Sequence, residues 1–159
     1  MSLCLVFTAG EGVTGAVIRA GTWSRAAHVG GLLDDGLVLD ATPSAGVALH
    51  PGIAGRVVGL FAVGCPPETE RAAIAWARRQ IGKPYDWTAI AGFFVRRDWH
   101  DPAAWFCMEL WLAAFEAAGW PLLQLRHLNR GSPRDGLLSP RLRELPVTEG
   151  LRLQLAMSL

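Results

Sequence analysis

The Asp34-Asp35-Gly36 segment, which lies between two apolar runs, most constrains how this chain folds. Asp-Gly between two such runs is a strong signal for a β-hairpin. The spacing predicts strands over residues 28–33 and 36–41. Because the two strands of a tight hairpin lie side by side, this hairpin presents both His28 and Asp40.

The rest of the chain predicts an α+β domain in which strands come first and helices follow. Helical spacing of apolar residues predicts helices over 13–19, 68–81, 87–94 and 107–118, joined in part by polar loops over 96–102 and 129–140. Alternating or β-branched segments predict further strands over 3–7, 46–50, 56–63 and 151–157. No internal repeat or linker interrupts the sequence, so we expect one domain over residues 1–159.

Composition narrows the class of protein. With 51% hydrophobic residues, the chain of 159 residues can bury a sizeable core. A net charge of +1 gives no basic field for nucleic acid. The three cysteines make no disulfide framework, and CxxC and HExxH spacings are absent, so we expect no metal or other cofactor. The chain lacks a basic leader and a long apolar run, which predicts a cytoplasmic protein without a transmembrane segment.

Cys107 lies at the predicted start of a helix, within Trp105-Phe106-Cys107-Met108-Glu109-Leu110-Trp111. A thiol in a first helical turn faces backbone N–H groups and the positive end of the helix dipole, which favour the reactive thiolate. Inert packing is the competing interpretation, because the neighbouring side chains are apolar. An N-cap at Asp101-Pro102 would also move Cys107 into the second turn, away from the dipole. Cys4 and Cys65 lie near no helix start and are predicted to be structural.

His28 is the candidate base for Cys107, because a cysteine with a distant histidine indicates covalent acyl chemistry. Alone, a histidine at a strand end is more often structural. Asp40 is the candidate that accepts a hydrogen bond from one ring nitrogen and leaves the other for sulfur. His50, at another strand end, is the alternative third residue if Asp40 points away.

Three segments together resemble the circularly permuted branch of the NlpC-type, papain-like cysteine hydrolases, as in YiiX-like proteins. They are Ala27-His28-Val29-Gly30, Val38-Leu39-Asp40-Ala41 and Phe106-Cys107-Met108-Glu109-Leu110, with Gly82-Lys83-Pro84-Tyr85-Asp86 before the last. In that branch the first segment supplies the base, the second the third polar residue, and the last opens the nucleophile helix. Met108 stands where the family usually has serine, and Asp40 where glutamate is commoner.

The resemblance implies a permuted papain-like domain, with an antiparallel sheet packed against helices. It implies that Cys107 is the nucleophile, that His28 is general base and then acid, and that Asp40 orients the imidazole. By the same analogy Tyr85 donates a hydrogen bond to the substrate or the oxyanion. The equal alternative is that Tyr85 serves only as a turn anchor.

The implied reaction is hydrolysis through a thioacyl enzyme on peptide-type amides such as cell-wall peptides, in a bacterial or phage setting. One alternative is an acyltransferase or lipid esterase related to lecithin retinol acyltransferase, with an apolar cleft formed by Met108 and the tryptophans. The other is a non-catalytic binding module of phage origin.

Overall fold

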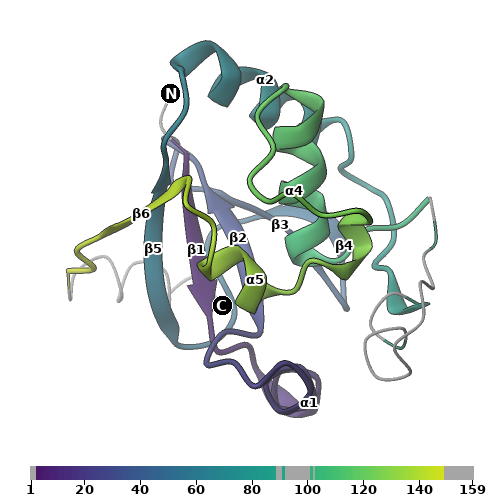
Figure 1. Ribbon diagram of the computed structural model, residues 1–159. Coiled ribbons are helices and arrows are strands. Elements are labelled where there is room, and N and C mark those ends of the chain that lie inside the picture. The colour runs from purple at the N-terminus through teal and green to yellow at the C-terminus, as the bar shows by residue number, and fades with distance from the viewer. Residues whose placement is uncertain (1–2, 89–90, 92–100, 102, 149–159) are drawn as a thin grey trace.

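The computed structural model describes residues 3–88, 91, 101 and 103–148, and combines a sheet with helices (Figure 1). The strands are β1 (Cys4–Thr8), β2 (His28–Leu32), β3 (Val38–Thr42), β4 (Gly46–His50), β5 (Val57–Val63) and β6 (Leu142–Leu145). The helices are α1 (Gly12–Thr22), α2 (Pro67–Arg78), α4 (Cys107–Ala117) and α5 (Pro133–Leu137), with a 3-10 turn, η1, at Leu128–Arg130. The α+β class that the sequence predicts is confirmed.

The six strands of the described chain form one sheet in the order β4-β3-β2-β1-β5-β6, and all neighbours are antiparallel. Side chains of β1 alternate between two apolar clusters. Leu5 and Phe7 join the main core, which also holds residues of α2 and α4, whereas Val6 joins a smaller cluster with Ile53 and Val57. The centre of the sheet is therefore buried on both faces.

Helix α4 packs against β2 because Gly31 leaves room for a tryptophan. Trp111 is fully buried, and a Cβ atom added to Gly31 would lie 2.1 Å from Trp111 Cζ2. α4 also contacts β3 and α2, so it is held between the sheet and a second helix. This packing fixes where Cys107, the first residue of α4, lies relative to the strands.

Most predicted elements are present with small shifts at their ends. The hairpin, the strands over 3–7, 46–50 and 56–63 and the helix over 107–118 are confirmed. α1 runs past Gly21 to Thr22, because Trp23 takes the left-handed conformation that ends it. α2 ends at Arg78, earlier than predicted, where hydrogen bonds change to three-residue spacing, such as Ile81 N–H to Arg78 O.

The prediction of a loop over 129–140 is wrong. Ser132 and Asp135 form a capping box at the start of α5, with Pro133 in the first turn. A Cβ atom at the buried Gly136 would lie 2.6 Å from Met108 Sδ, so this glycine marks close packing. Strand β6 was not predicted. The predicted strand over 151–157 lies outside the described residues, as do most of the helix over 87–94 and of the loop over 96–102.

We expect Gly31→Ala to lower the free energy of unfolding by about 1–3 kcal/mol, because the added methyl group must displace the ring of Trp111. Chemical denaturation followed by circular dichroism measures this change. Gly64→Ala is the matched control, because a Cβ atom there meets only Arg141 O at 3.4 Å, an ordinary contact. Equal stabilities of the two variants would contradict the proposed role of Gly31 in seating α4.

Candidate active site

The β2–β3 hairpin places His28 beside Asp40. Its register pairs Gly31 with Leu39, and continuing it sets Gly30 opposite Asp40, with His28 two residues along on the same side. His28 Nε2–H donates a hydrogen bond to Asp40 Oδ2 at 2.7 Å. Both side chains are buried. The juxtaposition of these two residues that the sequence predicts is thus present.

Strand β4 brings a second histidine to the same carboxylate. His50 Nε2 lies 3.2 Å from Asp40 Oδ1, which is ion-pair distance, although the angle is not that of a hydrogen bond. Burial raises the pKa of Asp40, but the contacts with His28 and His50 outweigh it and hold the pKa below its usual value. Asp40 is therefore an anion between two imidazoles. The sequence treats His50 as an alternative to Asp40, whereas the structure places both in one cluster.

Cys107 is the first residue of α4. Phe106 before it has an extended backbone, with φ −102° and ψ 168°, and acts as the N-cap. Asp101 closes a separate turn, in which its Oδ1 accepts a hydrogen bond from Ala103 N–H at 2.9 Å. The earlier helix start at Asp101-Pro102 is therefore excluded. The thiol lies where backbone N–H groups have no acceptor within the helix.

The Cys107 side chain lies close enough to His28 for the charges of the two groups to interact. Because Nε2 is directed at Asp40, Nδ1 is the ring nitrogen left for sulfur. Burial lowers the pKa of His28, but the charge of Cys107 and the hydrogen bond to Asp40 outweigh it, and the pKa rises to about 10. The imidazole is therefore protonated at neutral pH.

A short backbone ladder ties Tyr85 to the segment before the nucleophile. Tyr85 forms a parallel bridge with Trp105, in which Trp105 N–H donates to Pro84 O at 3.1 Å and Asp86 N–H donates to Trp105 O at 3.0 Å. On the other side of the same turn, Lys83 O accepts a hydrogen bond from Val47 N–H of β4 at 2.9 Å. These backbone hydrogen bonds hold Tyr85 between β4 and the start of α4.

The environment of Tyr85 keeps its phenol neutral. Burial raises the pKa of Tyr85, and the negative charges of Cys107, Asp86 and Asp40 raise it further. A neutral phenol is a hydrogen-bond donor, which suits the donor role that the resemblance implies as well as that of a turn anchor.

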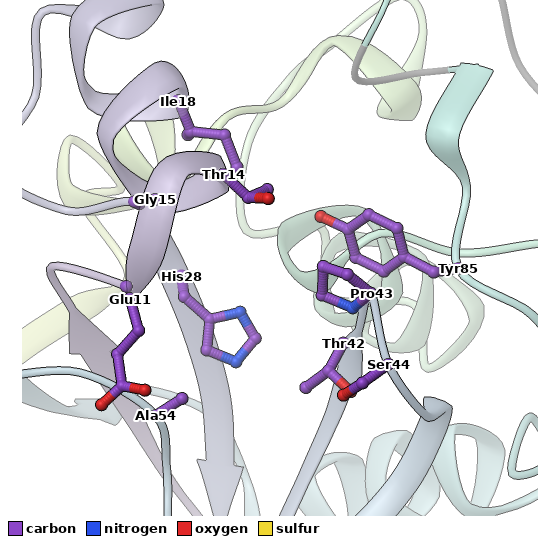
Figure 2. A pocket seen from close by; sticks show the side chains of 12 residues that line it. Glu11, Thr14, Gly15, Ile18, His28, Thr42, Pro43, Ser44, Ala54 and Tyr85 are labelled. Carbon is purple, nitrogen blue, oxygen red and sulfur yellow. The ribbon is translucent and has the colours of Figure 1, made fainter.

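A pocket of about 280 Å³ adjoins His28 and Tyr85, and Figure 2 shows the tyrosine hydroxyl directed into it. Helix α1 forms one wall. The lining consists of Gly10, Glu11, Thr14, Gly15, Ile18, Ala27, His28, Thr42, Pro43, Ser44, Ala54 and Tyr85. Small and apolar residues dominate it. Met108 and Trp111 are fully buried and do not line the pocket, so the expectation that these two residues contribute to an apolar cleft is wrong.

Sequence reasoning missed two buried carboxyl groups near the start of α4. Burial and the charge of Asp86 raise the pKa of Glu109 to about 8, while a hydrogen bond from the backbone of Phe106 lowers it. Asp86 accepts hydrogen bonds from Thr88 Oγ1–H at 2.6 Å and from Asp101 N–H at 3.0 Å. These carboxyl groups hold the loop before Cys107 in place. A glutamate three residues after an N-cap is a known helix-start signal that could have identified Glu109.

No family model matches the sequence, and a comparison with curated proteins gives no match. Among solved structures, the chain is similar to the crystal structure of YiiX from Escherichia coli O157:H7, which is described as a metalloprotein. The TM-score is 0.62 at 16% identity, and the match covers 93% of this chain and 97% of YiiX. The predicted relation to YiiX-like proteins is confirmed at the level of the fold.

YiiX is described as a metalloprotein, and a metal centre in this chain would need at least three ligand side chains around one point. Within residues 3–88, 91, 101 and 103–148, no group of three or more His, Cys, Asp or Glu side chains is arranged to hold one. Cys107, His28, Asp40 and His50 instead interact in pairs, Cys107 with His28 and each histidine with Asp40. The described residues therefore do not fit a metal centre.

Brief treatment with iodoacetamide should label Cys107 faster than Cys4 or Cys65, although Cys107 is 1% exposed and the other two are half-buried. Contact with a protonated imidazole activates Cys107, whereas burial and nearby glutamates raise the pKa of Cys65. Peptide mass spectrometry measures the order. With His28→Ala, labelling of Cys107 should slow, because the charged ring that interacts with the sulfur is removed. An order that follows exposure would indicate an inert, packed cysteine.

Histidine NMR should find the His28 ring protonated well above pH 6.5, with a pKa near 10. Asp40→Asn should lower this pKa, because it removes the charge and the hydrogen bond. Since the folded-state pKa is raised, the contribution of His28 to stability is complete below about pH 6.5 and is lost as pH rises through about 10. A His28 titration that Asp40→Asn leaves unchanged would contradict the pairing.

Proposed function

We propose that this protein is a cysteine hydrolase that acts through a thioacyl enzyme on Cys107. The observation that carries the proposal is the contact of Cys107, at a helix start, with a His28 side chain that Asp40 orients. A nucleophile, a base and an orienting acid beside a pocket form the arrangement used for covalent acyl transfer.

The first half-reaction begins from the ion pair of thiolate and imidazolium. The Cys107 sulfur attacks the carbonyl carbon of the substrate, and the C=O electron pair moves onto oxygen. The backbone N–H of Cys107, at the positive end of α4, can donate a hydrogen bond to this oxyanion, and Tyr85 is positioned as a second donor. When the tetrahedral intermediate collapses, His28 gives its proton to the departing nitrogen or oxygen, and the thioester remains.

The second half-reaction uses a change in the basicity of His28. The largest contribution that raises the pKa of His28 is the charge of Cys107, and a thioester carries no such charge. The neutral imidazole of the acyl enzyme therefore takes a proton from water, and the resulting hydroxide attacks the thioester carbon. The carboxylic acid leaves, the thiolate returns, and the imidazolium is restored. Asp40 keeps Nδ1 directed at sulfur throughout.

We propose further that the fold is a circular permutation of the papain-like fold. In papain-like proteases the cysteine precedes the histidine and the third residue along the chain. Here His28 and Asp40 precede Cys107, and the sheet that carries them precedes the nucleophile helix.

Two substrate classes fit this chemistry. Peptide-type amides, such as those of cell-wall peptides, remain the first proposal, because a protonated His28 is suited to protonating a leaving amine. Acyl esters are the second candidate, because Ile18, Ala27, Pro43 and Ala54 give the pocket an apolar lining. In both cases the intermediate is the same acyl-Cys107.

Incubation with a chromogenic acyl ester and, separately, with muropeptides should give turnover of one class and an acyl group on Cys107. Product release measures turnover, and peptide mass spectrometry locates the adduct. Cys107→Ala should lower turnover by at least about 10³-fold, whereas Cys65→Ala should leave it unchanged. Full turnover by Cys107→Ala would exclude this nucleophile. Absence of both turnover and acylation would favour a non-catalytic binding module.

A further inference from the structure

Helix α1 has apolar residues on its solvent side as well as on its inner side. Gly15 and Ile18 are buried, whereas Val13, Ala16, Val17 and Ala20 are exposed. Their i, i+3, i+4, i+7 spacing makes one continuous stripe along the helix. Val13 is 79% exposed and Val17 is 41% exposed. A helix with apolar residues on all sides is normally buried. We therefore expect the exposed stripe to contact another molecule.

Trp23 extends the stripe at the end of α1. Its side chain is 88% exposed, the largest exposed fraction among the bulky apolar residues of the described chain. Trp23 also adopts a left-handed backbone, with φ 52°, where helices normally use glycine. A bulky residue in this conformation is strained, and such strain is typically retained where it serves function.

The charge around the stripe identifies the partner. Between Glu11 and Asp34 the chain carries Arg19 and Arg25 and no acidic residue. Arg134 of α5 joins them, because its Nη1 donates a hydrogen bond to Thr22 O at 3.3 Å. An isologous contact with a second copy would place these arginines against one another. An apolar stripe with a tryptophan and flanking arginines instead matches the interface of an anionic lipid bilayer.

We propose that the stripe formed by Val13, Ala16, Val17, Ala20 and Trp23 docks this protein onto anionic membranes. No helix in the described part of the chain is long and apolar enough to cross a bilayer, so α1 lies in the interface. The opposite side of α1 lines the pocket beside His28 (Figure 2). Docking therefore brings the rim of the pocket within about one helix diameter, roughly 10 Å, of lipid.

The test is sedimentation with vesicles of phosphatidylcholine alone or mixed equally with phosphatidylglycerol. It uses the Cys107→Ala protein, so that binding is measured without turnover. The result is then independent of the proposed hydrolase activity. We expect binding to the mixed vesicles that weakens with added salt. Val13→Asp and Val17→Asp should each weaken it by about tenfold. Trp23→Ala should weaken binding and remove part of the blue shift in tryptophan fluorescence.

Ile81→Asp is the matched control. Ile81 is 44% exposed, close to the value for Val17, and lies outside the stripe, in the turn that follows α2. This variant should bind vesicles as the parent does. Three results would overturn the proposal: no binding to the mixed vesicles, equal binding by the Val13→Asp variant, or a change in oligomeric state or thermal stability of that variant without lipid. The last would mean that another copy or another part of the chain covers the stripe.

Discussion

The buried carboxylate of Asp40 is the constraint on which the rest of the site depends. A charge that is 1% exposed costs several kcal/mol unless cations or hydrogen-bond donors compensate it. His28 and His50 supply this compensation from β2 and β4, on either side of β3. A slip of one residue in either ladder would turn one histidine away and remove one of the two partners of this charge. The geometry of the site therefore depends directly on the register of the sheet.

A series of side-chain interactions connects Asp40 to helix α4. The carboxylate fixes the ring of His28, and the ring in turn faces the sulfur of Cys107, whose position depends on α4. The packing of the Trp111 ring against Gly31 sets the position of α4. Two opposing effects act on His28, and its anionic neighbours outweigh the loss of hydration. Burial strengthens the attraction between the two charges, because it removes screening water, but it also disfavours each charged form.

Local signals in the sequence were enough to predict some of these features. Asp-Gly between apolar runs predicts the hairpin with His28 and Asp40, and the apolar run after Cys107 predicts α4. The contact of α1 with the pocket, the Tyr85–Trp105 bridge and the burial of Met108 depend on tertiary packing, which no local pattern encodes. The prediction of a loop over residues 129–140 is wrong for a physical reason. Proline and glycine are common in loops, but here they serve helix initiation and close packing in α5.

The bridge between Tyr85 and Trp105 has an evolutionary consequence. Its bonds join Trp105 N–H to Pro84 O and Asp86 N–H to Trp105 O, and none of these atoms belongs to a side chain. A substitution at Pro84 or Trp105 that keeps the backbone conformation leaves these bonds, and the spacing between the tyrosine loop and the nucleophile helix, in place. Divergent sequences can then keep one architecture, as a TM-score of 0.62 with YiiX at 16% identity illustrates.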